Sequence, residues 1–180
     1  MEYRKRQTIN KIAYKIRDIL KLETPVDLKR LVTSLKGKIE YVDEIDGKEA
    51  RIQKIEDENF KFMITLPTYT MNQRDRFTIA HELGHLFLHM GYLVDKEKWK
   101  SIGTYKDSAY YRYGYSEEEY EANEFAGALL MPEAEFIQIA NDNKSEDGET
   151  YELDTIAEHF NVSIEAVKVR GRWLGMFEWE

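Results

Sequence analysis

Apolar residues recur at helical spacing in the first part of the chain. In residues 5–21 they lie three or four positions apart, opposite lysines and arginines, which predicts an amphipathic helix. Residues 24–27, Thr-Pro-Val-Asp, combine a capping hydroxyl with a proline in the first turn, as at the start of a helix. This second helix should end at Gly37, because glycine commonly follows the last helical residue.

The pattern then changes to the alternation of strands. Residues 39–42 and 50–56 are short candidates, and residues 60–66 give the clearest alternation in the chain. The Asp-Gly pair at 46–47 is a common hairpin turn, and Pro67 ends the third strand. We therefore expect a small, mainly antiparallel sheet after the two N-terminal helices.

Helical spacing returns in three later segments. Residues 78–90 and 116–131 each place apolar side chains on one face. Residues 153–174, which follow a polar loop at 141–150, predict a helix, a tight turn and a second helix that Ser163 caps. The chain of 180 residues is long enough for one domain, and its elements predict an α+β fold with helices around the small sheet.

The helix at 78–90 contains the motif His-Glu-x-x-His, at His81, Glu82 and His85. Residues four apart lie one above the other on a helix, so both histidine rings can point at one metal ion. Glu82 is displaced by one step around the helix and can reach a water on that metal. The arrangement is typical of a zinc metallopeptidase, with two ligands and a general base. The alternative is a partly buried polar face of a core helix.

Such a site needs a third protein ligand, since a catalytic zinc keeps its fourth position for water. A metzincin-type site would require a histidine at position 91, and Gly91 excludes that class. His89 lies a turn beyond His85 and is more typical of a structural polar residue. His159 lies too far along the chain to be a good candidate.

The helix at 116–131 offers carboxylates instead. Glu119 and Asn123 are four residues apart and face the same way, so Glu119 can bind the metal while Asn123 orients another ligand. Glu121 faces elsewhere. Ser116-x-x-Glu119 is also a capping-box pattern, which would use the carboxylate on the backbone of its own helix. Spacing alone leaves both roles of Glu119 open.

Residues 91–115 are rich in tyrosine and show no steady period. A loop of this length is often functional, and the alternative is a surface excursion over the core. As a flap over the active site, it would bring a tyrosine hydroxyl to a tetrahedral intermediate. The sequence does not single out one tyrosine for that role.

Composition narrows the chemistry and the location. Without cysteine, any metal must be held by histidines and carboxylates. Residues 1–38 carry 11 basic and 4 acidic side chains, whereas the remainder carries 15 basic and 30 acidic ones. The excess of acidic side chains after residue 38 argues against non-specific nucleic-acid binding and suits a basic protein partner. The N-terminus is no signal peptide and no apolar run would span a bilayer, so we expect a cytoplasmic protein that does not bind membranes.

The helix-turn-helix spacing at 153–174 raises direct DNA binding as a further function. Residues 151–180, however, hold six acidic side chains against three basic ones. Contact with phosphate depends on basic side chains. We therefore expect this segment to pack on the rest of the chain or to dock a protein.

Three motifs together resemble the ImmA/IrrE family of zinc metallopeptidases, which carry His-Glu-x-x-His and are gluzincin-like. They are His-Glu-Leu-Gly-His at 81–85, Glu-x-x-Ala-Asn-x-Phe-Ala at 119–126 and Leu-Leu-Met-Pro at 129–132. Residues 160–175 are similar to the tail that often follows in that family. The resemblance implies that Glu119 is the third ligand of Zn²⁺. We therefore expect a zincin-like domain over residues 1–140, N-terminal helices included, with the helical segment of 141–180 packed on or next to it.

The resemblance also implies proteolysis of narrow specificity. Members characteristically cleave a helix-turn-helix repressor of the Xre type, often encoded nearby on a mobile element or prophage, and so relieve repression after stress. By analogy with related peptidases, the substrate would lie extended along an edge strand near residues 60–66. The alternative is a regulatory binding module or toxin–antitoxin partner that holds a repressor or toxin without cutting it.

Overall fold

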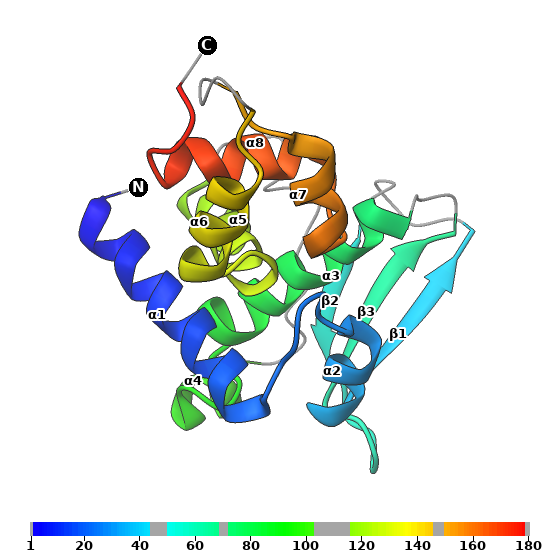
Figure 1. The fold of residues 1–180 in the computed structure, drawn as a ribbon. Helices are drawn as coiled ribbons and strands as arrows, with labels where there is room; N and C mark the ends of the chain where they lie inside the picture. Colours follow the sequence, from blue (N-terminus) through cyan, green and yellow to red (C-terminus); the bar gives the residue numbers. More distant parts are fainter. Residues whose placement is uncertain (1, 44–49, 69–71, 103–115, 146–149, 179–180) are drawn as a thin grey trace.

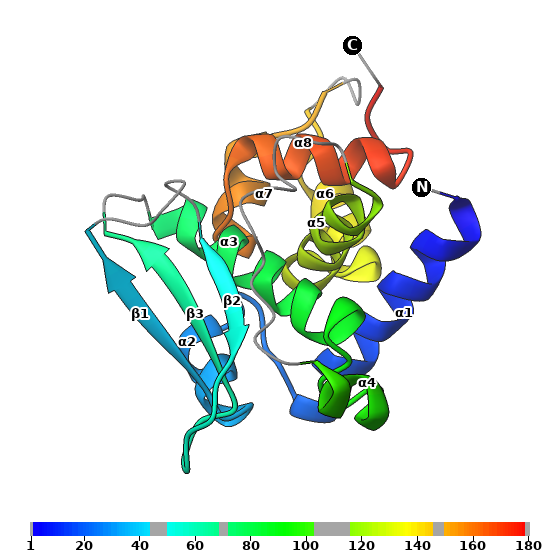
Figure 2. The same cartoon turned by 180° about the vertical axis from the view of Figure 1, so that it is seen from behind.

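The computed structural model describes residues 2–43, 50–68, 72–102, 116–145 and 150–178 (Figure 1). A group of helices lies beside a small sheet, and α2 lies against one face of that sheet (Figures 1 and 2). The elements are α1 Tyr3–Leu20, α2 Leu28–Ser34, β1 Gly37–Val42, β2 Arg51–Lys54, β3 Phe62–Pro67, α3 Asn72–Gly84, the π-helix η1 His85–His89, α4 Lys96–Ser101, α5 Glu117–Leu130, α6 Glu133–Asp142, α7 Leu153–Phe160 and α8 Ile164–Trp173.

The sheet is mixed, in the order β1-β3-β2. β1 runs parallel to β3 with Gly37 opposite Phe62, and β2 runs antiparallel to β3 with Ile52 opposite Ile64. The α+β class is confirmed, but the mainly antiparallel sheet is wrong for one of the two strand pairs. The expected hairpin between the first two strands is also wrong, because β3 lies between them. The Asp-Gly pair at 46–47 lies outside the described residues.

β3 takes the central position because it has the most apolar surface to bury. Phe62, Ile64, Thr65 and Leu66 are all almost completely buried, so both faces of the strand are covered. The strand expected to offer a free edge to a substrate is therefore the one strand with a neighbour on each side. The edges of the described sheet are β1 and β2.

The N-terminal helices form where the apolar pattern predicts, with one difference. α2 begins at Leu28, because Asp27 caps it by accepting a hydrogen bond of 3.0 Å from a backbone N–H of its first turn. The Thr24 hydroxyl, expected as the cap, instead donates to Glu135 at 2.8 Å. Thr24 therefore ties the segment before α2 to the start of α6.

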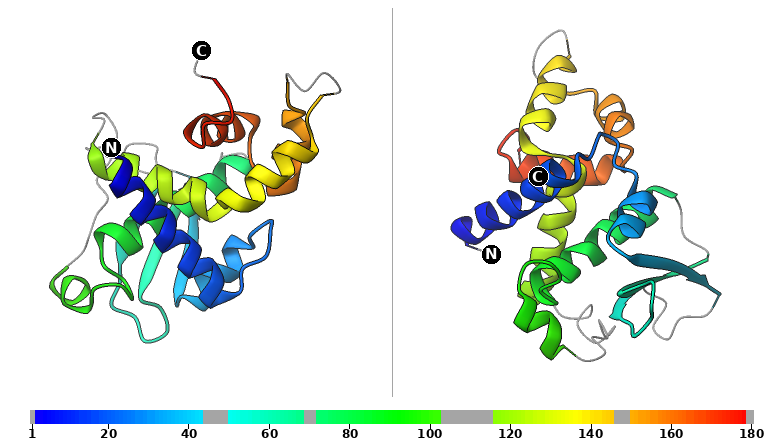
Figure 3. Two further views of the ribbon diagram at one scale, coloured as in Figure 1. Left: turned by 60° about the vertical axis from the view of Figure 1, so that its left-hand side comes forward. Right: turned by 90° about the horizontal axis from the view of Figure 1, so that it is seen from below.

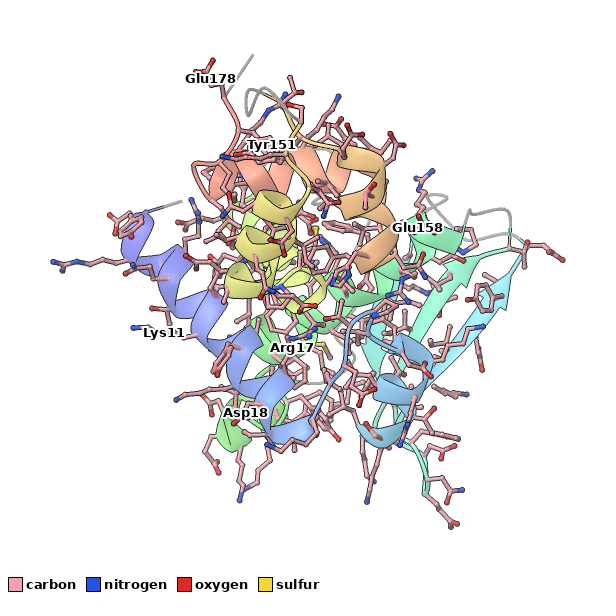
Figure 4. All side chains as sticks on the ribbon, in the orientation of Figure 1. Lys11, Arg17, Asp18, Tyr151, Glu158 and Glu178 are labelled. Atoms are coloured by element: carbon pink, nitrogen blue, oxygen red, sulfur yellow. The ribbon has the colours of Figure 1, made fainter. Side chains whose placement is uncertain are left out.

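α1 lies along α5 (Figure 3). Arg17 points from α1 into the interior, whereas Lys11 and Asp18 lie on its outer side (Figure 4). The Arg17 guanidinium donates to the carbonyl oxygen of Leu129 at 2.7 Å, near the end of α5. A long cationic side chain thus completes a helix end, where carbonyl groups lack partners within the helix.

The C-terminal segment forms the expected helix, tight turn and helix. α7 ends at Phe160, and the next residue, Asn161, closes the turn with a positive φ of 51°. The Ser163 hydroxyl caps α8 by accepting from the Ala166 N–H at 3.2 Å. Among the helices that the structure describes, none is long and apolar enough to cross a membrane.

Arg170 joins α8 to the rest of the molecule from a position that is only 3% exposed. Its guanidinium donates to Glu124 on α5 at 3.0 Å, to Asn10 on α1 at 2.9 Å and to the Met131 carbonyl oxygen at 3.1 Å. The three bonds satisfy a buried charge from three directions, as burial of arginine requires. The helices α1, α5 and α8 therefore meet at the side chain of Arg170.

Replacing Arg170 by methionine should lower the free energy of unfolding by about 3–5 kcal/mol, because it leaves Glu124 buried without its main countercharge. Denaturant unfolding at pH 7 measures the loss. Lys168→Met is the matched control, since Lys168 lies on the same helix and makes no ion pair with a described residue. Equal stability of the Arg170→Met and Lys168→Met proteins would contradict this account.

Candidate metal centre

α3 and η1 carry the two histidines of the His-Glu-x-x-His motif. His81 and His85 are both buried, and their Nε2 atoms lie 3.0 Å apart. The helix expected over 78–90 is present, but it widens into a π-helix from His85, where the Met90 N–H donates to the His85 carbonyl oxygen at 2.9 Å. Such π-helical turns are rare and frequently occur at functional sites.

Glu119 approaches the same point from α5. Its Oε2 lies 3.2 Å from His81 Nε2, and its Oε1 lies 3.2 Å from His85 Nε2. The Ser116 hydroxyl caps α5 by accepting from the Glu119 N–H at 3.3 Å. The cap thus uses the backbone of Glu119, while its carboxylate faces the two histidines.

Asn123, one turn after Glu119, holds the outer side of His81. Its Oδ1 lies 2.9 Å from His81 Nδ1. An amide oxygen only accepts, so His81 carries its proton on Nδ1 and presents a lone pair on Nε2 toward Glu119 and His85. This is the tautomer that a metal ligand requires. The predicted orienting role of Asn123 agrees with this contact.

His85, like His81, has a polar neighbour on its Nδ1 side, and this neighbour was not predicted. Its Nδ1 lies 2.9 Å from Nδ1 of His89, and His89 Nε2 lies 3.3 Å from Oε2 of Glu121. His89 is therefore a buried polar residue, as expected, but it contacts a candidate ligand directly. The four-residue spacing from His85 to His89 was the available signal. Glu121 could not be linked to His89 without knowing how α3 and α5 pack.

The electrostatics of the cluster favour a bound cation. Burial raises the pKa of Glu119, but hydrogen bonds and positive charge from His81 and His85 in their protonated forms outweigh burial and lower that pKa well below its ordinary value; a bound cation would take the place of those protons. Glu119 is thus ionised at neutral pH. Burial and the neighbouring His85 lower the pKa of His89, which favours its neutral form.

The remaining predicted positions are placed as follows. Glu82 is fully buried on α3, next to His81 in the chain. His159 lies apart from the cluster and pairs with Glu135 at 2.9 Å. The group of described residues that can hold a metal ion consists of His81, His85 and Glu119, whose ligand atoms all lie within 4.8 Å of one another.

The tyrosine-rich segment is only partly described. Residues 96–101 form α4, so the expectation of an aperiodic loop is wrong there. Tyr92 is buried and donates to the Leu35 carbonyl oxygen at 2.7 Å, which gives it a structural role. The other tyrosines of that segment, between 105 and 115, lie outside the described residues, and the flap remains a prediction.

Gly84 allows α3 and α5 to approach closely enough to assemble the cluster. A Cβ atom on Gly84 would lie 2.9 Å from the Cα of Ala122 and 3.1 Å from its carbonyl oxygen. Both are backbone atoms of α5 that cannot turn away. Gly84 therefore lets α3 and α5 pack closely beside the candidate ligands.

This arrangement defines a class: an α+β fold in which His-Glu-x-x-His on one helix and a glutamate on a second helix can hold a metal ion. The model of the M78 peptidases, described as the IrrE N-terminal-like domain, matches residues 44–171. The chain belongs to this family.

The solved structures include a Mycobacterium tuberculosis transcriptional regulator that is similar in fold, with a TM-score of 0.60 at 19% sequence identity. The alignment covers 91% of this chain and 46% of the regulator, so the chain spans about half of that protein. Comparison with curated proteins gives no match.

Replacing Gly84 by alanine should weaken metal binding and lower stability by about 1–3 kcal/mol, because overpacking outweighs the gain in helix propensity of about 1 kcal/mol. Isothermal titration with zinc and denaturant unfolding measure the two effects. Gly127→Ala on α5 is the control, since its Cβ would lie 3.7 Å from the nearest side-chain atom, an ordinary contact. Equal zinc affinity of the two variants would refute the role of close approach.

Proposed function

We propose that this protein is a zinc-dependent endopeptidase of narrow specificity. The observation that carries the proposal is the triangle of ligand atoms, with separations of 3.0, 3.2 and 3.2 Å. Tetrahedral zinc with bonds of about 2.0–2.1 Å needs ligand atoms about 3.3 Å apart. Two nitrogens and one carboxylate also form the ligand set of known zinc hydrolases, with a fourth position for water.

The chemistry divides between the metal and Glu82. Zinc held by His81, His85 and Glu119 would act as a Lewis acid that lowers the pKa of water from about 16 to roughly 7. Glu82 would take a proton from the attacking water and later return it to the leaving amine, as a general base and then a general acid. Asn123 would keep His81 in the tautomer that leaves Nε2 available.

The proposed substrate is a protein segment in extended form. Since β3 is the central strand, we place the substrate along the outer edge of β2, with which no described strand pairs. β2 is the edge strand next to α3 (Figure 2). Lys54 at its end donates to the carbonyl oxygens of Trp99 and Ile102 at 2.8 and 2.9 Å, which fixes β2 to the end of α4.

We further propose an Xre-type helix-turn-helix repressor as the substrate, cleaved to relieve repression in the cytoplasm. Family membership supports a peptidase, and the acidic body of the chain suits a basic protein. DNA is a poor candidate partner, because Arg170, one of three cations in residues 151–180, is buried on Glu124. Salt-dependent retardation of duplex DNA by the full chain would contradict that part.

The second candidate is a binding module that holds a repressor or toxin without cutting it. The same ligands would serve both functions, because binding a partner protein at the metal requires no turnover. Incubation with the product of a regulator gene that neighbours the gene of this protein, with and without chelator, would separate the two. Chelator-sensitive fragments support the peptidase, whereas a stable complex without fragments supports the binding module.

Replacing Glu82 by glutamine should reduce cleavage by at least about 100-fold, because the amide cannot accept the proton of the attacking water. Zinc content should stay near one ion per chain, since Glu82 is not a ligand. Fragment formation by gel and zinc by elemental analysis are the two measurements. Glu165→Gln, an exposed change on α8, is the control and should cleave normally. Full activity of the Glu82→Gln protein would exclude the mechanism.

Replacing Glu119 by alanine should have a different signature, with zinc lost together with cleavage. Only two protein ligands would remain, below the three that catalytic zinc sites use. Elemental analysis after dialysis against a weak chelator measures the loss. Retention of zinc by the Glu119→Ala protein would show that another residue is the third ligand.

A further inference from the structure

His85 is held from behind by a chain of polar side chains that leads to the N-terminal helix. His85 Nδ1 meets His89 Nδ1 at 2.9 Å, and His89 Nε2 meets Glu121 at 3.3 Å. Lys5 on α1 completes the chain by pairing with the other carboxylate oxygen of Glu121. His89 and Glu121 are both buried, while Lys5 is the one member that solvent reaches.

The direction of each hydrogen bond in this chain follows from its two ends. An ionised Glu121 only accepts, so it accepts one hydrogen bond from the Lys5 ammonium group and another from the Nε2–H of His89. His89 in its neutral form then has a lone pair on Nδ1, which accepts from the Nδ1–H of His85. His85 is left with its lone pair on Nε2, the atom that faces Glu119 and His81. Every donor has an acceptor when a metal takes that last lone pair.

This series of hydrogen-bonded side chains connects the metal centre to a part of the molecule outside the family match. That match begins at residue 44, whereas Lys5 belongs to α1, Tyr3–Leu20. α1 is held on α5 at other points too, by Asn10 through Arg170 and by Arg17 through the Leu129 carbonyl oxygen. Among these contacts of described residues, the Lys5 contact is the one that leads to a candidate ligand, through Glu121 and His89.

We propose that Lys5, Glu121 and His89 form a positioning chain that fixes the ring of His85 for the metal, so that docking of α1 and metal binding are coupled. The proposal rests on the metal site of the proposed function. His89 and Glu121 are positioning residues, since they act through His85. Coupling between two binding events is reciprocal. Metal binding must therefore strengthen the docking of the N-terminal turn of α1 by the same factor by which that docking strengthens metal binding.

The test compares zinc dissociation constants of the full chain, measured by competition with a chromophoric chelator. His89→Leu should bind zinc about 10- to 100-fold more weakly, the usual effect of removing the partner of a ligand histidine. His89→Gln should recover most of that affinity, because an amide oxygen can accept from His85 while its NH₂ group donates to Glu121. His159→Leu, which removes a histidine paired with Glu135 outside the cluster, should bind like the unchanged protein.

The contribution of α1 is tested with Lys5→Met against Lys11→Met. Lys5→Met should weaken zinc binding about two- to fivefold, as expected of a half-exposed ion pair. Lys11 lies on the outer side of the same helix (Figure 4) and makes no ion pair with a described residue, so Lys11→Met should leave the affinity unchanged. Both residues lie on α1, away from the candidate metal ligands, so both substitutions remain informative if His89→Leu does not fold.

Two readouts separate positioning from simple packing. The visible spectrum of the Co²⁺-loaded protein should change in His89→Leu and be restored in His89→Gln. Zinc should slow hydrogen exchange of the first turns of α1 in the unchanged protein and much less in Lys5→Met. A purely structural role would shift unfolding of the metal-free protein and leave the spectrum and the zinc effect on α1 untouched.

The outcomes distinguish this inference from the proposed function. Tight zinc binding by the unchanged protein together with equal constants for His89→Leu, His89→Gln and Lys5→Met would overturn the positioning chain alone. Failure of the unchanged protein to bind zinc would overturn the proposed function as well. Three results together would establish the positioning chain: weaker zinc binding in His89→Leu, recovered binding in His89→Gln and a smaller loss of binding in Lys5→Met.

Discussion

The metal centre depends on how closely α3 and α5 approach. Gly84 faces the backbone of Ala122 with no room for a methyl group. At this separation His81, His85 and Glu119 bring their ligand atoms to within 3.0–3.2 Å of one another. These separations are close to those that tetrahedral zinc requires.

α5 distributes four polar side chains around its axis, and they contact three different groups of neighbours. Glu119 and Asn123 face the histidine pair, Glu121 faces His89 and α1, and Glu124 faces Arg170 on α8. Three of the four are acidic, so their carboxylates would repel one another if those neighbours were removed. The helix that supplies the third ligand is therefore also the helix around which the N-terminal and C-terminal helices assemble.

Local periodicity was sufficient to predict much of this molecule. Spacing of four residues placed His81 with His85 and Glu119 with Asn123, and the family resemblance assigned Glu119 as the ligand that spacing had left open. Strand order was not predictable in the same way, because alternation identifies a strand but not its partner; β3 became central through burial on both faces. The link from His89 to Glu121 and Lys5 depends on packing among three helices, and no single stretch of sequence contains it.

The contact between the two ends of the chain has a consequence for folding. Asn10 and Arg170 are 160 residues apart in sequence and directly hydrogen-bonded. Contacts of such long range form late, because a large loop must close before they return any stabilisation. During synthesis the residues that can hold the metal are complete at Glu119, whereas Glu124 receives its buried countercharge only once α8 has emerged. Before α8 is made, a nascent chain would thus possess the candidate ligands while Glu124, on the same helix as Glu119, still lacks its buried countercharge.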